Sequence, residues 1–333
     1  MSDPLQAARE VAGAVRFSQD EVSSETGIPF RNAQATQIRN DSLHNGIAVS
    51  EAVVPKVAGA FRLASEALRI PDGAVKGYVF PHRTIQAICI QATEARCLVR
   101  VSSEACNLLS LEELAFVVGH ELGHFLLGHT KEPVAEPSLA WLGQQRFQEL
   151  SADRVGRLAC GALDMGLRAM MMTATGLSRE ELRFDAVAHV GQIGEVDPEY
   201  DIGLERSTHP PILLRSRALV RFESALQDGG KKALSRVDSQ VAAELDRYVG
   251  RWARERADGL RRDLAMWQAL REATKDGVFD RAEQRAFGKR FGTENLEKVK
   301  NLLRNMSPAD FREFLSGKVA ETKRELAALS GGG

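Results

Sequence analysis

The strongest constraint on this chain is the pentapeptide His120-Glu121-Leu122-Gly123-His124, which lies in an almost wholly apolar run. Residues four apart share a helix face, so a helix here presents the rings of His120 and His124 to one point. Glu121 lies one position round, close enough to contact a water at that point. Two imidazoles, one carboxylate and a water are the groups that zinc-assisted hydrolysis requires.

The residues around the pentapeptide predict a buried helix with a defined start. Ser110, with Glu113 three residues later, forms a capping box. Apolar residues then recur at helical spacing, namely Leu111, Leu114, Ala115, Val118, Leu122, Phe125 and Leu126. Further apolar residues flank the two histidines. Histidine and glutamate in such surroundings are costly unless something compensates them, and a metal ion is the simplest compensation.

Two later residues are candidates for the third protein ligand that a catalytic zinc needs. On a helical wheel His129 falls on the core side, about half a turn from His120 and away from His124, which favours a satisfied histidine at the helix end. Glu149 and Asp153 are four apart in a second helical run, on the face that also carries the small residues Ala152 and Gly156. A close approach of the two helices would let Glu149 reach the metal and Asp153 fix the tautomer of a ligand histidine. The alternative is a solvated acidic face with Arg154 as partner.

These motifs resemble the M48 metallopeptidases, a group of gluzincins. The resemblance rests on His-Glu-Leu-Gly-His, then Glu149-Leu-Ser-Ala-Asp153-Arg-Val-Gly156, then Ser207-Thr-His209-Pro-Pro211 with Arg215, and spans roughly residues 50 to 225. It implies one zinc per chain held by His120, His124 and Glu149, with Glu121 as general base. It also implies that Asp153 orients a ligand histidine, and that His209 and Arg215 stabilise the oxyanion or, for His209, that it contacts the resting zinc. The alternative for His209-Pro210 is an ordinary helix-start turn.

The expected fold class is α+β and mostly helical: a gluzincin-type core with a small β-sheet and an active-site helix, followed by a C-terminal α-helical domain. Strands are expected at 77–80, 85–91 and 96–101, and an amphipathic helix at 52–70 that Pro71-Asp72-Gly73 ends. An edge strand beside the zinc helix can align an extended peptide through main-chain hydrogen bonds. The expected domains are an N-terminal arm at 1–50, the M48-like domain at 51–228 and the helical domain at 233–330.

Composition limits the partners and the compartment. The 333 residues carry a formal net charge of −1, which gives no reason to expect nucleic acid or an anionic membrane surface as a partner. No apolar run reaches the roughly 18–20 residues that a membrane span needs, and the start lacks the apolar core of a signal peptide. The four cysteines show no C-x-x-C spacing and are expected to be reduced thiols, mostly buried. The expected location is therefore cytoplasmic.

Two segments outside the motifs have open interpretations. Residues 1–50 are a packed extension or, alternatively, a pro-segment over the cleft. The stretch from Glu272 to Glu283 resembles both the back half of a calcium-binding EF-hand loop and the turn of TerB-like helical domains, but Glu272 and Thr274 stand where an EF-hand prefers Asp or Asn. A helix–turn–helix with Asp280 as cap is the favoured interpretation.

Two functions from different classes fit these features. The first is a zinc endopeptidase that acts on protein or peptide substrates. The second is a catalytically latent metal-binding scaffold or sensor whose C-terminal helices bind a partner or a second copy. Glu121 discriminates between them, because a protein without catalytic activity would tolerate its loss.

Overall fold

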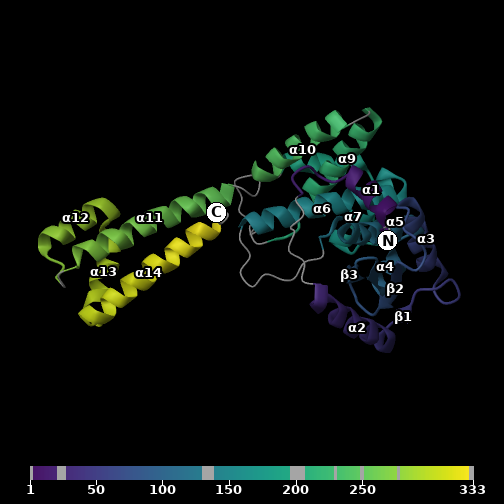
Figure 1. Cartoon of the computed structure of the whole chain (residues 1–333). Coiled ribbons are helices and arrows are strands. Elements are labelled where there is room, and N and C mark those ends of the chain that lie inside the picture. Colours follow the sequence, from purple (N-terminus) through teal and green to yellow (C-terminus); the bar gives the residue numbers. More distant parts are fainter. Residues whose placement is uncertain are drawn as a thin grey trace. The chain divides into compact units, whose positions relative to one another are not determined.

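The computed structural model describes residues 3–20, 28–129, 139–195, 207–228, 231–247, 251–275 and 278–329. Backbone contacts divide the chain into two compact units (Figure 1). The first comprises Met1–Ala135 and Gly143–Tyr248, and the second Glu136–Leu142 and Val249–Gly333.

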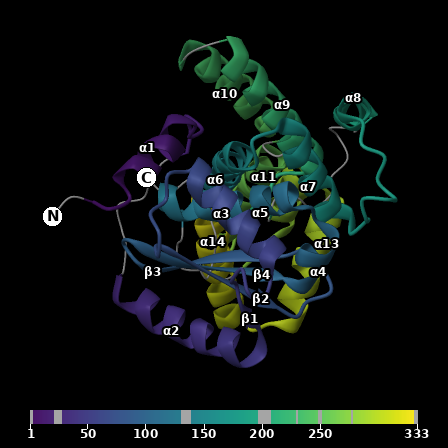
Figure 2. The same ribbon diagram turned by 90° about the vertical axis from the view of Figure 1, so that its right-hand side faces the viewer.

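A four-stranded mixed sheet lies in the first unit, in the order β1-β2-β4-β3. Its strands are β1 (Ile47–Ala48), β2 (Val75–Phe80), β3 (Ala87–Thr93) and β4 (Arg96–Ser102). β2 runs parallel to β4, whereas β1 and β3 pair antiparallel with their neighbours. The three predicted strands are therefore confirmed, and β3 is an outer strand of the sheet. Figure 2 shows α2 (Ile28–Asn45) on the face of the sheet opposite to α3 (Pro55–Ala67) and α5 (Leu111–Leu127).

The first unit contains further helices besides α2, α3 and α5. They are α1 (Gln6–Ala14), α4 (Ser103–Leu108), α6 (Leu139–Cys160), α7 (Leu163–Thr175), α8 (Ala186–Gly191), the 3-10 helix η1 (Gln192–Glu195), α9 (Ile212–Asp228) and α10 (Lys231–Leu245). α5 contacts α1, α3, α7, β3 and β4, so it is the central helix of the unit. The mostly helical α+β class expected from the sequence is confirmed.

The capping box predicted at the start of α5 is present. Ser110 Oγ accepts from the backbone N–H of Glu113, and the Glu113 carboxylate accepts from the backbone N–H of Ser110. At the other end Gly128 adopts a left-handed conformation (φ 76°), which stops the helix directly after Leu127. Leu114, Val118 and other apolar side chains of the helix are fully buried, as its pattern predicts.

Small residues bring α5 and α6 close together. A Cβ on Gly119 would overlap the side chain of Ala159 and lie 3.1 Å from the backbone of Gly156. A Cβ on Gly123 would lie 3.0 Å from Val155 Cβ and 3.1 Å from Ala152 Cα. The close approach that the small residues Ala152 and Gly156 predicted is thus observed, and the glycines of α5 also contribute to it.

We expect Gly119→Ala to lower the free energy of unfolding, because the added methyl meets Ala159 and backbone that cannot move aside cheaply, at a cost of about 1–3 kcal/mol. The gain of about 1 kcal/mol that alanine usually brings to a helix interior offsets part of this cost, which leaves a net loss of up to about 2 kcal/mol. Urea unfolding measures the difference. Gly143→Ala in α6, where no atom of the described residues lies within 4 Å of the added Cβ, is the matched control. Equal or greater stability of Gly119→Ala would contradict the close contact.

Residues near the start of the chain pack into the core of the first unit. Leu5, directly before α1, and Ala8 and Ala12 on α1 are buried in the same apolar cluster as the central residues of α5. Phe17 is also fully buried, and its ring stacks on Phe147 of α6 with centroids 5.3 Å apart. This packing favours the interpretation of the N-terminal region as an integral extension of the fold.

The first unit also extends beyond residue 228, where the sequence predicted the end of the M48-like domain. Val241 and Leu245 of α10 are buried against Leu214 and Ala218 of α9. Arg217 and Arg221 of α9 form ion pairs with Glu244 of α10, at 2.8 and 2.6 Å. These contacts explain why the compact unit includes α10, a helix that the sequence grouped with the C-terminal domain.

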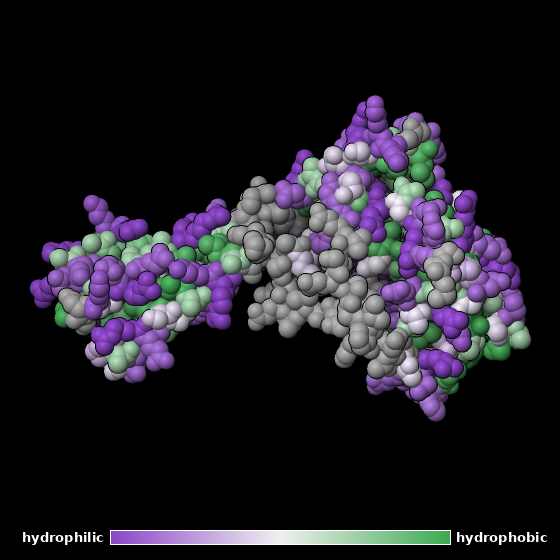
Figure 3. All heavy atoms as spheres, in the orientation of Figure 1, coloured by the Kyte–Doolittle hydropathy of each residue, from purple (hydrophilic) through white to green (hydrophobic). Residues whose placement is uncertain are grey.

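The second unit is helical. It contains α11 (Arg251–Ala273), α12 (Arg281–Phe291), α13 (Thr293–Asn305) and α14 (Pro308–Leu329). Its own apolar core is built from Met266, Leu270, Phe287, Val299, Phe311 and Leu315. Figure 3 shows a mainly hydrophilic surface on the visible side of these helices, with apolar residues interspersed.

The turn before α12 supports the favoured helix–turn–helix interpretation. Asp280 caps α12 by accepting from the backbone N–H groups of Ala282 and Glu283, and Glu283 accepts from the N–H of Asp280 in return. The Glu283 carboxylate is therefore engaged in the cap. Residues 276 and 277 of the suggested calcium loop lie outside the described residues.

Two further expectations concern membrane-spanning helices and the cysteines. Among the described helices, none has both the length and the apolar character to cross a membrane. The four cysteines are free thiols; Cys89, Cys97 and Cys160 are buried and Cys106 is half-buried.

Candidate metal centre and peptide cleft

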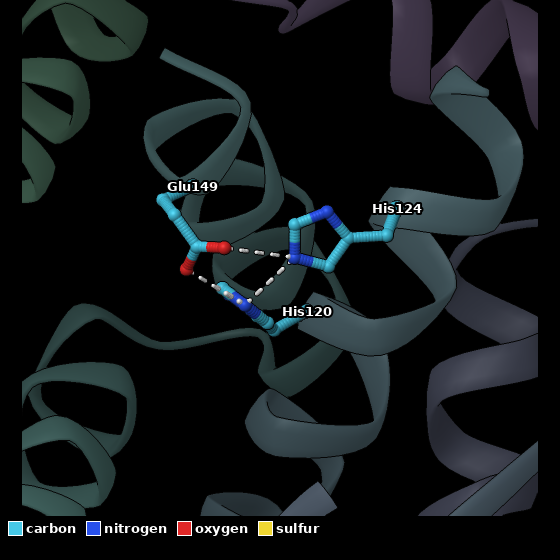
Figure 4. Close-up of side chains that lie close together, drawn as sticks. All are labelled: His120, His124 and Glu149. Atoms are coloured by element: carbon cyan, nitrogen blue, oxygen red, sulfur yellow. Dashed lines mark hydrogen bonds and ion pairs between the residues drawn. The ribbon is translucent and has the colours of Figure 1, made fainter. Parts of the chain in front are cut away.

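Three side chains converge between α5 and α6. Figure 4 shows His120 and His124 projecting from one helix toward Glu149, which projects from another. The two Nε2 atoms are 3.2 Å apart. His120 Nε2 lies 3.5 Å from Glu149 Oε2, and His124 Nε2 lies 3.4 Å from Glu149 Oε1. The predicted ligand set is therefore brought together, and the three residues could hold one metal ion.

The spacing and chemistry of this triangle fit a tetrahedral ion. Ligand atoms about 2.0–2.1 Å from a tetrahedral zinc lie about 3.3–3.4 Å from one another. The distance between the two Nε2 atoms, 3.2 Å, and the distances from these atoms to one or the other oxygen of Glu149, 3.5 and 3.4 Å, are close to this value. Glu149 Oε2 is buried and has no partner within hydrogen-bond geometry among the described residues. Its neighbours are more distant: His209 Nε2 at 3.4 Å, His120 Nε2 at 3.5 Å and Arg215 Nη2 at 3.7 Å. A buried carboxylate oxygen without a close partner is costly, and a cation at the centre would satisfy it. Two imidazoles with one carboxylate is a ligand set typical of catalytic zinc.

Asp153 lies behind the ligands, one turn after Glu149 on α6. Its Oδ1 is 3.0 Å from His120 Nδ1, so it can accept the outer proton of that ring. Arg215 of α9 donates to the same carboxylate twice, from Nε at 2.9 Å and from Nη2 at 2.6 Å. The carboxylate thus has one partner on α5 and one on α9. Arg154, the alternative partner for an acidic face, instead pairs with Asp238 at 2.6 Å.

The electrostatics of the cluster favour positive charge at its centre. Burial alone would lower the pKa of His120, but hydrogen bonds to Asp153 and the nearby Glu149 raise it to about 10. Burial alone would raise the pKa of Glu149, yet the two imidazoles hold it well below its usual value. The pKa of Arg215 would also fall on burial, but Asp153 raises it above the usual value, so Arg215 is a permanent cation.

A cleft of about 560 Å³ opens beside the three converging side chains. Glu121 lines it together with His120 and Glu149. The outer strand β3 contributes Ala87 and Ile88, and the residue before it, Gln86, also lines the cleft. Apolar side chains of α5 and α7 line it as well, namely Phe116, Val117 and Met170. The cleft therefore joins a polar end at the candidate metal centre to an apolar surface and an exposed strand edge.

His209 and Arg215 both reach the cleft. His209 Nε2 lies 3.4 Å from Glu149 Oε2, and its side chain is 61% exposed. Arg215 Nη2 lies 3.7 Å from the same oxygen. His209 is also part of a turn before α9, where its backbone N–H and its carbonyl both contact Ser207 Oγ. His209 therefore both forms the turn before α9 and lines the cleft.

The sequence placed His129 away from His124, and this is wrong. The two Nδ1 atoms are 3.0 Å apart. The helical wheel fails here because α5 ends at Leu127, and the left-handed Gly128 turns His129 back against the last turn of the helix. His129 is still satisfied, as expected, because its Nε2 is 2.8 Å from Asp20 Oδ2. Burial lowers the pKa of His129 to about 4, so the ring is neutral.

Asp20 is a site residue that the sequence did not suggest. It lies 109 positions before His129, and no motif joins the two. One local feature of the sequence could have indicated the direction of His129. Gly128 precedes it, and a glycine directly after a helix end commonly reverses the chain.

Comparison with known proteins gives one match. The family model for peptidase family M48 matches residues 62–136, which run from α3 to beyond α5 and include the histidine pair and Glu121. This is less than a quarter of the chain, and it ends before Glu149. No curated protein and no solved structure matches the chain. The resemblance to peptidase family M48 is thereby confirmed, and residues 62–136 carry the sequence pattern of that family.

Proposed function

We propose that the chain is a zinc-dependent endopeptidase with a gluzincin-type core. The observation that carries this proposal is the triangle of His120, His124 and Glu149 at the polar end of the cleft, with Glu121 beside it. The match to peptidase family M48 over the same helix supports a peptidase. When bound, zinc would polarise the scissile carbonyl and lower the pKa of a water in the cleft.

The residues of the chain then have separate tasks. Glu121 takes the proton of the attacking water and delivers it to the leaving amine. Asp153 accepts the outer proton of His120, which leaves Nε2 of that ring free for the metal. Arg215, fixed by its two hydrogen bonds to Asp153, and His209 stabilise the oxyanion that develops at the carbonyl.

The cleft indicates how a substrate would lie. β3 pairs with β4 along one edge only, so its other edge offers main-chain groups to an extended peptide. The apolar side chains Phe116, Val117 and Met170 would receive an apolar side chain near the scissile bond. The substrate is therefore an unfolded segment or a flexible loop of a protein.

The second unit contributes none of the described residues that line the cleft. Its helices take no part in the proposed chemistry. Binding of a protein partner, or self-association, remains the prediction for this unit. The latent-scaffold alternative is less well supported, because Glu121 is retained and lines the cleft.

Removal of the metal tests the proposal directly. We expect the purified chain to cleave casein, to lose this activity after treatment with a zinc chelator, and to regain it when one equivalent of zinc is restored. Metal analysis should find one zinc per chain. N-terminal profiling of a digested proteome would then show whether apolar residues border the cleaved bonds. Cleavage that continues unchanged after complete removal of metal would contradict the proposal.

A further inference from the structure

The outer nitrogen of His124 is the start of a hydrogen-bonded chain that leads away from the cleft. His124 Nδ1 is 3.0 Å from His129 Nδ1, and His129 Nε2 is 2.8 Å from Asp20 Oδ2. The side chains of His129 and Asp20 are 1% and 0% exposed. The other oxygen of Asp20 accepts from Gln144 Nε2 at 3.2 Å. The chain is therefore buried, and it ends on an acceptor.

With both rings neutral, one arrangement of protons satisfies this chain. The ionised carboxylate of Asp20 can only accept, so a neutral His129 carries its single proton on Nε2. His129 Nδ1 is then an acceptor, and His124 must donate to it from Nδ1. The Nε2 of His124 is left with a lone pair that faces His120 and Glu149. In the reverse arrangement His129 would present a lone pair to Asp20, and a proton on His124 Nε2 would occupy the metal position.

We propose that Asp20 is a positioning residue for the metal centre, acting through His129 to fix the tautomer and orientation of His124. This inference rests on the proposed metal site. The family match at residues 62–136 includes His124 and His129 but not Asp20, which precedes it. The two metal-binding histidines thus depend on different carboxylates. Asp153 serves His120 directly, and Asp20 serves His124 through an intervening ring.

The segment that carries Asp20 is held rigidly enough for this role. Arg16 Nη2 donates to the carbonyl of Leu127 at the end of α5, at 2.9 Å. The backbone N–H of Phe17 donates to Ser151 Oγ on α6, at 3.0 Å, and that of Ser18 donates to Asp238 Oδ2 on α10, at 2.8 Å. Residues 16–18 are thereby attached to three helices, so Asp20 has a defined position relative to His129.

Zinc affinity of the full-length chain is the first test, measured by competition with a chromophoric chelator. Asp20→Asn keeps the shape of the side chain but can donate to His129 and so permits the reverse arrangement; we expect its zinc affinity to fall about 10–100-fold, as for other outer partners of ligand histidines. Asp238→Asn is the matched control. This variant removes a buried carboxylate that accepts from Ser18 and pairs with Arg154. The Asp238 carboxylate is not part of the hydrogen-bonded chain from His124 through His129 to Asp20. Equal zinc affinities of the two variants would overturn the proposal.

The proton positions in the wild-type chain give an independent test. Nitrogen-15 NMR of the imidazole rings, with and without zinc, should show His129 protonated at Nε2 and His124 protonated at Nδ1. A proton on His129 Nδ1 would overturn the proposal even if Asp20→Asn did not fold. The tautomer measurement does not depend on peptidase activity, so it also separates the two proposals. If the chain bound zinc and showed the expected tautomers but cleaved no peptide, the proposed function would be contradicted and this inference would stand.

Discussion

Glu121→Gln is expected to keep one zinc per chain and to lower kcat for peptide cleavage by about 10³-fold, within the range usual for loss of a general base. Glutamine has nearly the shape of glutamate but cannot accept the proton of the attacking water. Glu121 lines the cleft beside His120 without belonging to the ligand triangle, so the metal should remain bound. Steady-state cleavage of a fluorogenic peptide, with metal analysis of the same sample, measures both quantities.

The control for this variant is a glutamate of the same unit that lies far from the cleft chemistry. Glu66 on α3 is exposed and lines no part of the cleft, so Glu66→Gln should cleave at the wild-type rate. Wild-type turnover of Glu121→Gln would refute its role as base. A loss of zinc together with activity would instead assign Glu121 to the ligand set.

Glu149→Gln is expected to abolish stable zinc binding and, with it, peptide cleavage. The substitution removes the only carboxylate of the ligand triangle, and the effect should exceed the about 10–100-fold loss typical of outer partners. Saturating zinc at 1,000 times Kd stabilises a protein by about 4 kcal/mol. The wild type should therefore gain thermal stability on addition of zinc, and the variant should gain little. His124→Ala should behave in the same way.

Glu223→Gln is the matched control for Glu149→Gln. Glu223 on α9 pairs with Arg157 of α6 at 2.7 Å, so its loss also breaks a contact of the helix that carries Glu149. Glu223 is not one of the three candidate ligands. The zinc affinity and the zinc-induced stabilisation of the Glu223→Gln variant should therefore equal those of the wild type. If Glu149→Gln retained both properties, Glu149 would not be a ligand.

Local patterns were sufficient to predict the helical elements that carry the candidate site. The capping box at Ser110 and Glu113 set the start of α5, and the four-residue spacing placed His120 and His124 on one face. The spacing of Glu149 and Asp153 worked in the same way on α6, and small residues indicated that the helices approach closely. Helical periodicity and side-chain size are properties of short segments, which is why a single sequence reveals them.

Contacts between distant segments were not predictable in this way. Asp20 meets His129 across 109 residues, and the packing of α10 on α9 depends on the shape of two complete helices. The placement of His129 failed for a more local reason, since one left-handed glycine changed its direction. The wheel describes a helix only as far as the helix continues.

The attachment of residues 16–18 has a consequence for the order of events during synthesis. Asp238, the acceptor for Ser18, is translated 220 residues after it, and Ser151 is translated 134 residues after Phe17. At about 5–20 residues per second, the wait for Asp238 is roughly 10–45 s on the ribosome. The N-terminal segment cannot be fully anchored before then, so the nascent chain acquires these contacts beside its candidate metal centre only after Asp238 has been translated.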